Sequence, residues 1–220
     1  MIPMATEALE LLLILVLITN FYLLGASPLG AAIRMAGMQG VLLAGLPLLS
    51  HAQNLSTHLF FLAAGSLLVK GILIPRLLLW SMRDVSMRRE VRPYLGFSSS
   101  LAVGVLCLAA SFWLSSLVSF PFSTGSRLLF PTALFMFLCG IFLIIVRKKA
   151  LSQVIGYLVM ENGIFVFATA LAAEQPLVVE MGVLLDLLVG VFVMGIAVYH
   201  INQEFDHIDS EALDVLKDSE

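Results

Sequence analysis

The sequence predicts an all-α, polytopic transmembrane helical bundle with about seven spans. Of its 220 residues, 60% are hydrophobic and only 12% are charged, which is about half the charge of a soluble domain. Apolar runs of the ~20 residues that cross a bilayer recur along the whole chain. The first run has no Lys or Arg before it, so we expect a true span rather than a signal peptide.

Each predicted span is an apolar run bounded by polar residues, Pro or Gly, and the short connections favour antiparallel neighbours. We expect a three-span unit with a basic loop over 1–94, a fourth span and outer turn over 95–126, a second three-span unit over 127–201 and an acidic cytoplasmic tail over 202–220. The predicted spans are Thr6–Leu24, Ala31–Leu49, Thr57–Trp80, Leu95–Leu117, Leu128–Val146, Leu151–Leu171 and Leu177–Tyr199.

The basic residues predict the orientation of these spans. Ten of the twelve Lys and Arg residues fall on one side of the seven-span arrangement, while Arg127 falls on the other and Lys70 lies inside a span. Basic residues collect on the cytoplasmic side of membrane proteins. We therefore expect the N-terminus outside and the C-terminus in the cytoplasm.

The second and sixth spans hint at an internal repeat. Ala32–Leu49 aligns with Val154–Leu171 without a gap, and Gln39 then falls on Glu161. This alignment suggests that the first three spans are a diverged copy of the last three.

Three charged residues lie deep inside predicted spans: Lys70, Glu161 and Asp186. The rise of 1.5 Å per helical residue places all three near mid-membrane, at similar heights. A charge there is costly and usually functional. Burial favours the neutral forms of a carboxyl and an amine, so these groups are candidates for a proton relay. The structural alternative is that they pair with each other or with neighbouring subunits and only hold helices together.

Small residues accompany the two acids. Gly182 and Gly190 share a helix face with Asp186, and Gly156 and Gly163 line a face beside Glu161. Glycines on one face let another helix approach closely. We expect these faces to turn the acids toward the bundle interior.

Two further residues belong to the candidate relay. Pro75 cannot donate a hydrogen bond to the carbonyl of Gly71, so we expect a kink or an unpaired acceptor near Lys70. His200, at the inner end of the last span, is a candidate for proton uptake, although a histidine at a membrane surface is more often inert.

The sequence offers no site for catalysis, metal or cofactor. Cys107 and Cys139 lie singly in different spans, whereas an iron–sulfur or zinc site needs about four clustered ligands. We expect both to act as small hydrophobic residues. Motifs of hydrolases and nucleotide-binding proteins are absent. The predicted environment is a lipid bilayer, and nothing suggests a nucleic-acid partner.

The stretch IGYLVMENGIFVFATALAAEQPLVVEMGVLLDLLVGVFVMGIAV resembles the C-terminal half of the hydrogenase-4 E component. The run FFLAAGSLLVKGILIPRLL, with Lys70 and Pro75, is similar to the third span of that family. The last three spans also resemble the K subunit of respiratory complex I and the C subunit of multisubunit sodium/proton antiporters. Glu161 matches the first membrane acid of that subunit, and Asp186 matches the second with one methylene fewer.

The resemblance implies a non-catalytic membrane-arm subunit of a complex I-like group 4 nickel–iron hydrogenase of the formate hydrogenlyase type. It implies a multi-pass protein of the prokaryotic inner (cytoplasmic) membrane. The expected partners are antiporter-like and other membrane-arm subunits and a peripheral hydrogenase arm that holds the nickel–iron and iron–sulfur centres. The relay would couple electron transfer to proton translocation. The alternatives are a subunit of a multisubunit cation/proton antiporter and a purely structural scaffold.

Overall fold

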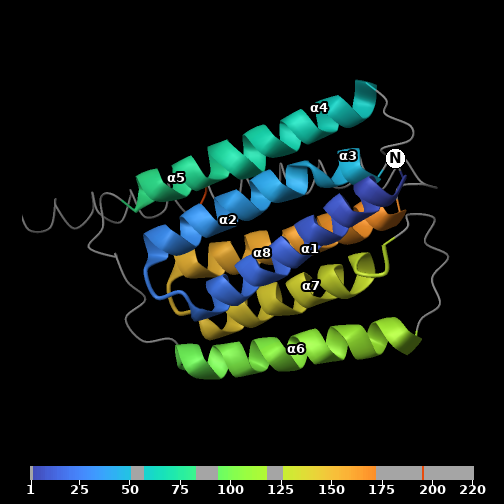
Figure 1. Cartoon of the computed structure of the whole chain (residues 1–220). Coiled ribbons are helices and arrows are strands. Elements are labelled where there is room, and N and C mark those ends of the chain that lie inside the picture. Colours follow the sequence, from blue (N-terminus) through green and yellow to red (C-terminus); the bar gives the residue numbers. More distant parts are fainter. Residues whose placement is uncertain (1, 51–56, 83–93, 118–125, 172–194, 196–220) are drawn as a thin grey trace, which may run out of the picture.

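A computed structural model of the chain describes residues 2–50, 57–82, 94–117, 126–171 and 195, and these form a helical bundle (Figure 1). Six stretches within these residues are long and apolar enough to cross a membrane. They coincide with the first six predicted spans and confirm the all-α membrane fold. The seventh predicted span, 177–199, lies outside the described residues, and so does the tail, 202–220.

The helices follow the predicted spans closely, and the turns between them contain Pro, Gly or basic residues. The elements are α1 (Ile2–Gly25), α2 (Leu29–Ala44), α3 (Leu46–Ser50), α4 (Thr57–Ser66), the π-helix η1 (Leu67–Leu73), α5 (Ile74–Ser81), α6 (Phe97–Leu117), α7 (Leu129–Val146) and α8 (Ala150–Leu171). Pro28, with φ −75°, precedes α2, where its fixed φ suits a helix start.

Helix α2 occupies the centre of this arrangement. The run α4–η1–α5 lies on one side of it, α1 and α8 lie on the other, and α7 and then α6 follow (Figure 1). Helices α1 and α7 run in one direction, whereas α2 and α8 run in the other. Because α2 contacts η1, α1 and α8, it is placed to set the positions of side chains on all three.

The core is apolar and lies between α1, α2, α7 and α8. Phe135 of α7 is completely buried and its ring packs against Phe21 of α1, with centroids 5.2 Å apart. Helix α6 is peripheral: among its described side chains only the small residues Ser100, Gly104 and Ser111 are buried. Several of its large side chains, Leu106, Trp113 and Leu117 among them, are more than 60% exposed, as a membrane environment allows.

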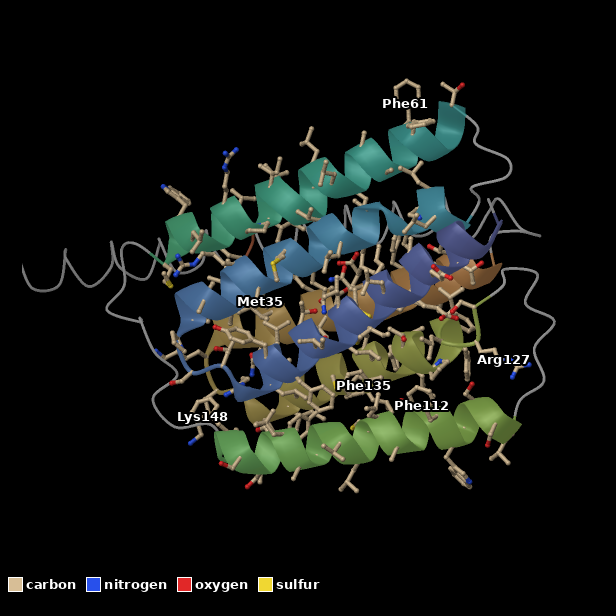
Figure 2. All side chains as sticks on the ribbon, in the orientation of Figure 1. Met35, Phe61, Phe112, Arg127, Phe135 and Lys148 are labelled. Carbon is tan, nitrogen blue, oxygen red and sulfur yellow. The ribbon has the colours of Figure 1, made fainter. Side chains whose placement is uncertain are left out.

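Apart from Lys70, the described basic residues lie toward the ends of the bundle. Arg34, Arg76 and Lys148 are exposed, and Figure 2 shows Lys148 and Arg127 at opposite ends. The orientation predicted from the sequence rests on this distribution of basic residues between the two ends. Which end faces the cytoplasm stays a prediction.

A seven-residue π-helix precedes Pro75, where the sequence predicts a kink or an unpaired carbonyl. The amide of Ile74 donates to the carbonyl of Val69, five residues earlier. Proline lacks the amide that would continue the α-helical pattern, and a wider turn is one way to accommodate it. Lys70 lies in this segment, and π-helical turns inside α-helices are frequent at functional sites.

Helices α7 and α8 form a close hairpin, and glycines permit the close approach. A β-carbon on Gly156 would lie 2.8 Å from the backbone nitrogen of Ile144. A β-carbon on Gly163 would lie 2.7 Å from the nitrogen of Phe137 and 2.8 Å from the carbonyl oxygen of Ala133. Backbone atoms cannot move aside as a flexible side chain can. The glycines beside Glu161 therefore bring α8 directly against α7.

We predict that Gly163→Ala destabilises the protein by about 1–3 kcal/mol, the usual cost of overpacking, despite the better helix propensity of alanine. Gly65→Ala is the matched control, because a β-carbon there meets nothing within 4 Å. Thermal unfolding of the purified protein in detergent measures both. Equal melting temperatures for the two variants would contradict the close packing of α7 and α8.

A buried ion pair and polar network as the candidate functional site

Lys70 and Glu161 form a salt bridge inside the bundle. The Nζ of Lys70 lies 2.5 Å from Oε1 of Glu161, and the two side chains are 3% and 1% exposed. One residue comes from η1 and the other from α8, which are far apart in the sequence. Pairing lowers the cost of each charge in the membrane interior. The structure thus brings together two of the three predicted mid-membrane charges.

An aromatic ring completes the surroundings of the lysine. The ammonium of Lys70 lies 4.7 Å from the centroid of the Phe165 ring. Phe165 is four residues after Glu161, so the two side chains share a face of α8. The sequence analysis missed Phe165; its spacing from Glu161 is the only signal that points to it.

Two glycines of α2 let η1 approach. A β-carbon on Gly40 would lie 2.9 Å from the backbone of Lys70, and one on Gly37 would lie 2.7 Å from the ring of Pro75. Larger residues at either position would push η1 away from α2. Pro75, predicted to accompany the relay, is therefore part of the contact that places Lys70.

A chain of buried polar side chains runs from Asn162, which follows Glu161 in the sequence, to α1. The amide of Asn162 donates to Oε1 of Gln39 at 3.1 Å. Gln39 in turn donates to the hydroxyl of Thr19 and to Oδ1 of Asn20, each at 3.0 Å. All four residues are at most 5% exposed. The chain ties α8, α2 and α1 together at the residue next to Glu161.

The sequence analysis missed most of this network. It noted Gln39 only as the counterpart of Glu161 in the repeat, and it gave no role to Thr19, Asn20 or Asn162. Amides inside apolar helices were the available signal, because such groups bond across helices when buried. Asp186, Gly182, Gly190 and His200 lie outside the described residues, so their predicted places stay predictions.

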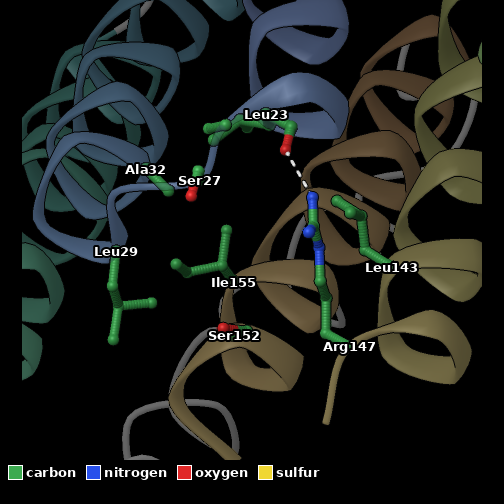
Figure 3. Close-up of a pocket in the computed structure, with 9 residues that line it drawn as sticks. Leu23, Ser27, Leu29, Ala32, Leu143, Arg147, Ser152 and Ile155 are labelled. Atoms are coloured by element: carbon green, nitrogen blue, oxygen red, sulfur yellow. Dashed lines mark hydrogen bonds between the residues drawn. The ribbon is translucent and has the colours of Figure 1, made fainter. Parts of the chain in front are cut away.

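Arg147 is buried, although the sequence analysis counted it with the basic residues of a loop. Its side chain donates to the carbonyl oxygen of Leu24 at 2.8 Å and to that of Leu23 at 3.5 Å (Figure 3), and its guanidinium lies 4.9 Å from the centre of the Phe97 ring. Carbonyls at a helix C-terminus lack partners within the helix. Arg147 supplies those partners and thereby caps α1.

A small cavity of about 20 Å³ lies beside Arg147. Side chains of α1, α2, α7, α8 and the turn after α1 line it, as Figure 3 shows. Its lining is largely apolar apart from Arg147, Ser27 and Ser152, and its size suits one water molecule.

The two cysteines lie closer than the sequence analysis expected. Cys107 of α6 and Cys139 of α7 are free thiols, and Cys107 packs against the apolar cluster that contains Cys139. Among the described residues, no three His, Cys, Asp or Glu side chains gather in a group that could hold a metal ion.

Residues 128–218 match the family model of NADH-ubiquinone/plastoquinone oxidoreductase chain 4L. This region contains α7, α8 and Glu161, whereas Lys70 and Gln39 come from the part of the chain before it. The helical fold and this match define the class of the protein: it is a complex I-like membrane subunit, as the resemblance implies.

Relatives extend the likeness to most of the chain. The uncharacterised protein Rv0085 of Mycobacterium tuberculosis is 31% identical over 193 residues, which cover 86% of this chain and 87% of that protein. Hydrogenase-4 component E of Escherichia coli, like that of Shigella flexneri, is 26% identical over 160 residues, 73% of this chain and 74% of the relative. The chain therefore belongs to the family of the mycobacterial protein. No solved structure matches it significantly.

We predict that Gln39→Leu destabilises the protein by about 1–3 kcal/mol, because the variant leaves buried polar groups of Asn162 and α1 without their partner. Met38→Leu is the control, because Met38 is 48% exposed and lies outside the network. Unfolding in increasing denaturing detergent compares the two variants with wild type. If the network does not stabilise the protein, Gln39→Leu will be as stable as Met38→Leu.

Proposed function

We propose that this chain is a non-catalytic membrane-arm subunit of a complex I-like group 4 nickel–iron hydrogenase, and that Lys70 and Glu161 take part in proton translocation coupled to electron transfer. The buried ion pair within 2.5 Å is the observation that carries the proposal. The likeness to a protein named hydrogenase-4 component E and to chain 4L supports the class of complex.

Other subunits then carry out the hydrogen chemistry and hold the metal centres. Nickel–iron and iron–sulfur centres belong to a peripheral arm, and antiporter-like subunits flank this chain in the inner membrane of a prokaryotic cell. Within the chain, a proton that arrives at Glu161 neutralises the carboxylate and removes the partner charge of Lys70. A charge without its partner in the membrane interior is unfavourable. Loss of the pair is thus a local event, and we propose Asp186 and His200 as further members of the same relay.

The same ion pair supports a second candidate, a purely structural scaffold. A salt bridge between η1 and α8 holds together two helical segments from different parts of the chain. Breaking a buried pair by removing one partner is strongly destabilising, whereas replacing both partners with apolar residues is often neutral. This difference provides a test.

We predict that Glu161→Gln lets the complex assemble and evolve hydrogen but weakens coupled proton transport several-fold. The double variant Lys70→Met with Glu161→Gln removes both charges, so assembly is retained while transport is lost. Native gels measure assembly, gas production measures hydrogen evolution, and a pH-sensitive dye measures proton uptake into inverted membrane vesicles. Glu10→Gln, in the first turns of α1, is the control.

The outcomes separate the two candidates. A scaffold predicts that the single variant fails to assemble and that the double variant regains both assembly and transport. Normal proton transport in an assembled double variant would exclude a role of the pair in translocation.

We also predict that affinity purification of the tagged chain from mild detergent brings down nickel- and iron–sulfur-containing subunits. Metal analysis and mass spectrometry of the eluate detect them. A stable complex that contains antiporter-like subunits but no nickel or iron–sulfur protein would instead indicate a cation/proton antiporter.

A further inference from the structure

The ammonium of Lys70 is within reach of two attractive groups at once. It lies 2.5 Å from a carboxylate oxygen of Glu161 and 4.7 Å from the centre of the Phe165 ring. Both groups stand on the same face of α8, one turn apart. Transfer of the ammonium from one to the other would therefore require rotation of the side chain and no displacement of a helix.

The contact with the ring takes place away from water. Lys70 and Phe165 are 5% and 8% exposed. The face of an aromatic ring carries partial negative charge and attracts a cation, and the attraction is larger in a desolvated site. It is strong enough there to shift an equilibrium by roughly tenfold to thirtyfold.

We propose that the Phe165 ring is the second partner of Lys70, which holds the ammonium when Glu161 is protonated. This inference rests on the proposed function and makes Phe165 a positioning residue for the proton step. When a proton neutralises the carboxylate, the ion pair loses its attraction and the charge of Lys70 remains in the membrane interior. The ring replaces part of the lost attraction, so the state with a protonated Glu161 becomes accessible.

The surrounding charges favour this assignment. On the helices packed against η1, which are α2, α4 and α5, the charged side chains described are basic. Arg34 and Arg76 are exposed at one end of the bundle, and neither attracts an ammonium. Gln39 and Asn162 are neutral and are engaged with each other. The ring of Phe165, 4.7 Å from the ammonium, is therefore placed to attract Lys70 when Glu161 is neutral.

The test is Phe165→Leu, which keeps an apolar side chain but removes the ring, in the whole complex. Phe167→Leu is the control, because Phe167 is on the same helix and its ring faces Phe130, 6.0 Å away. Infrared spectroscopy follows the carbonyl absorption of protonated Glu161, which is identified as the band that Glu161→Gln removes. We expect Phe165→Leu to weaken this band at a fixed pH and to reduce proton transport by no more than the several-fold loss expected of Glu161→Gln, with hydrogen evolution and assembly unchanged.

Two further substitutions at position 165 separate charge from shape. Phe165→Trp keeps an attractive ring face and should retain the band and most transport. Pentafluorophenylalanine at this position keeps the shape but removes the negative face, and should behave like leucine. If the fluorinated ring behaves like phenylalanine, or if Phe165→Leu equals Phe167→Leu in both readouts, the ring is only packing and the inference is wrong.

Failure of the underlying function gives a different pattern. If Glu161→Gln removes no infrared band and transports protons normally, the ion pair has no part in translocation, whatever the variants at Phe165 do. If Glu161→Gln removes the band and weakens transport while all variants at Phe165 match wild type, only the role of Phe165 is overturned.

Discussion

The salt bridge between Lys70 and Glu161 constrains the arrangement of the inner helices. Either charge alone is costly at this depth, so the contact between η1 and α8 is favoured although distant parts of the sequence supply them. Helix α2 packs against both elements, and the meeting therefore requires a close approach of η1 to α2. Gly40 and Gly37 provide it at the backbone of Lys70 and at Pro75. The buried charges thus favour a close contact between helices, and the glycines permit that contact.

Helix α2 contacts the segments that carry both partners of the ion pair. Gly40 sets the distance to the segment that carries Lys70, and the adjacent Gln39 bonds to Asn162, which neighbours Glu161. Two consecutive residues therefore fix both partners of the ion pair. Because each hydrogen bond of Gln39 has a defined donor and acceptor, the network favours a single register of α8 against α2.

The sequence predicts the spans well because bilayer thickness imposes a length that apolar runs reveal directly. It also predicts that Glu161 and Lys70 are important, since their cost in lipid is independent of fold. It does not predict which charges meet, because helical periodicity gives the face of a residue within its own helix and not the neighbour of that face. For the same reason Phe165 and the bonds of Gln39 became evident only in three dimensions. The π-helix was missed because the constraint from Pro75 permits several outcomes.

Helix α6 contributes little to the core, yet it decides how the two halves of the chain meet. Helix α1, the α2–α3 segment and the α4–α5 run make three crossings, and α7 starts at the same end of the bundle as α1. An odd number of crossings leaves the chain at the opposite end, so a fourth crossing is needed to return it. Without α6, helices α7 and α8 would cross the membrane in the opposite orientation. Helix α8 would then run antiparallel to α2 instead of parallel to it. Helix α6, the least buried of the six spans that the structure describes, is thus a topological spacer, whose length and presence matter more than its side chains.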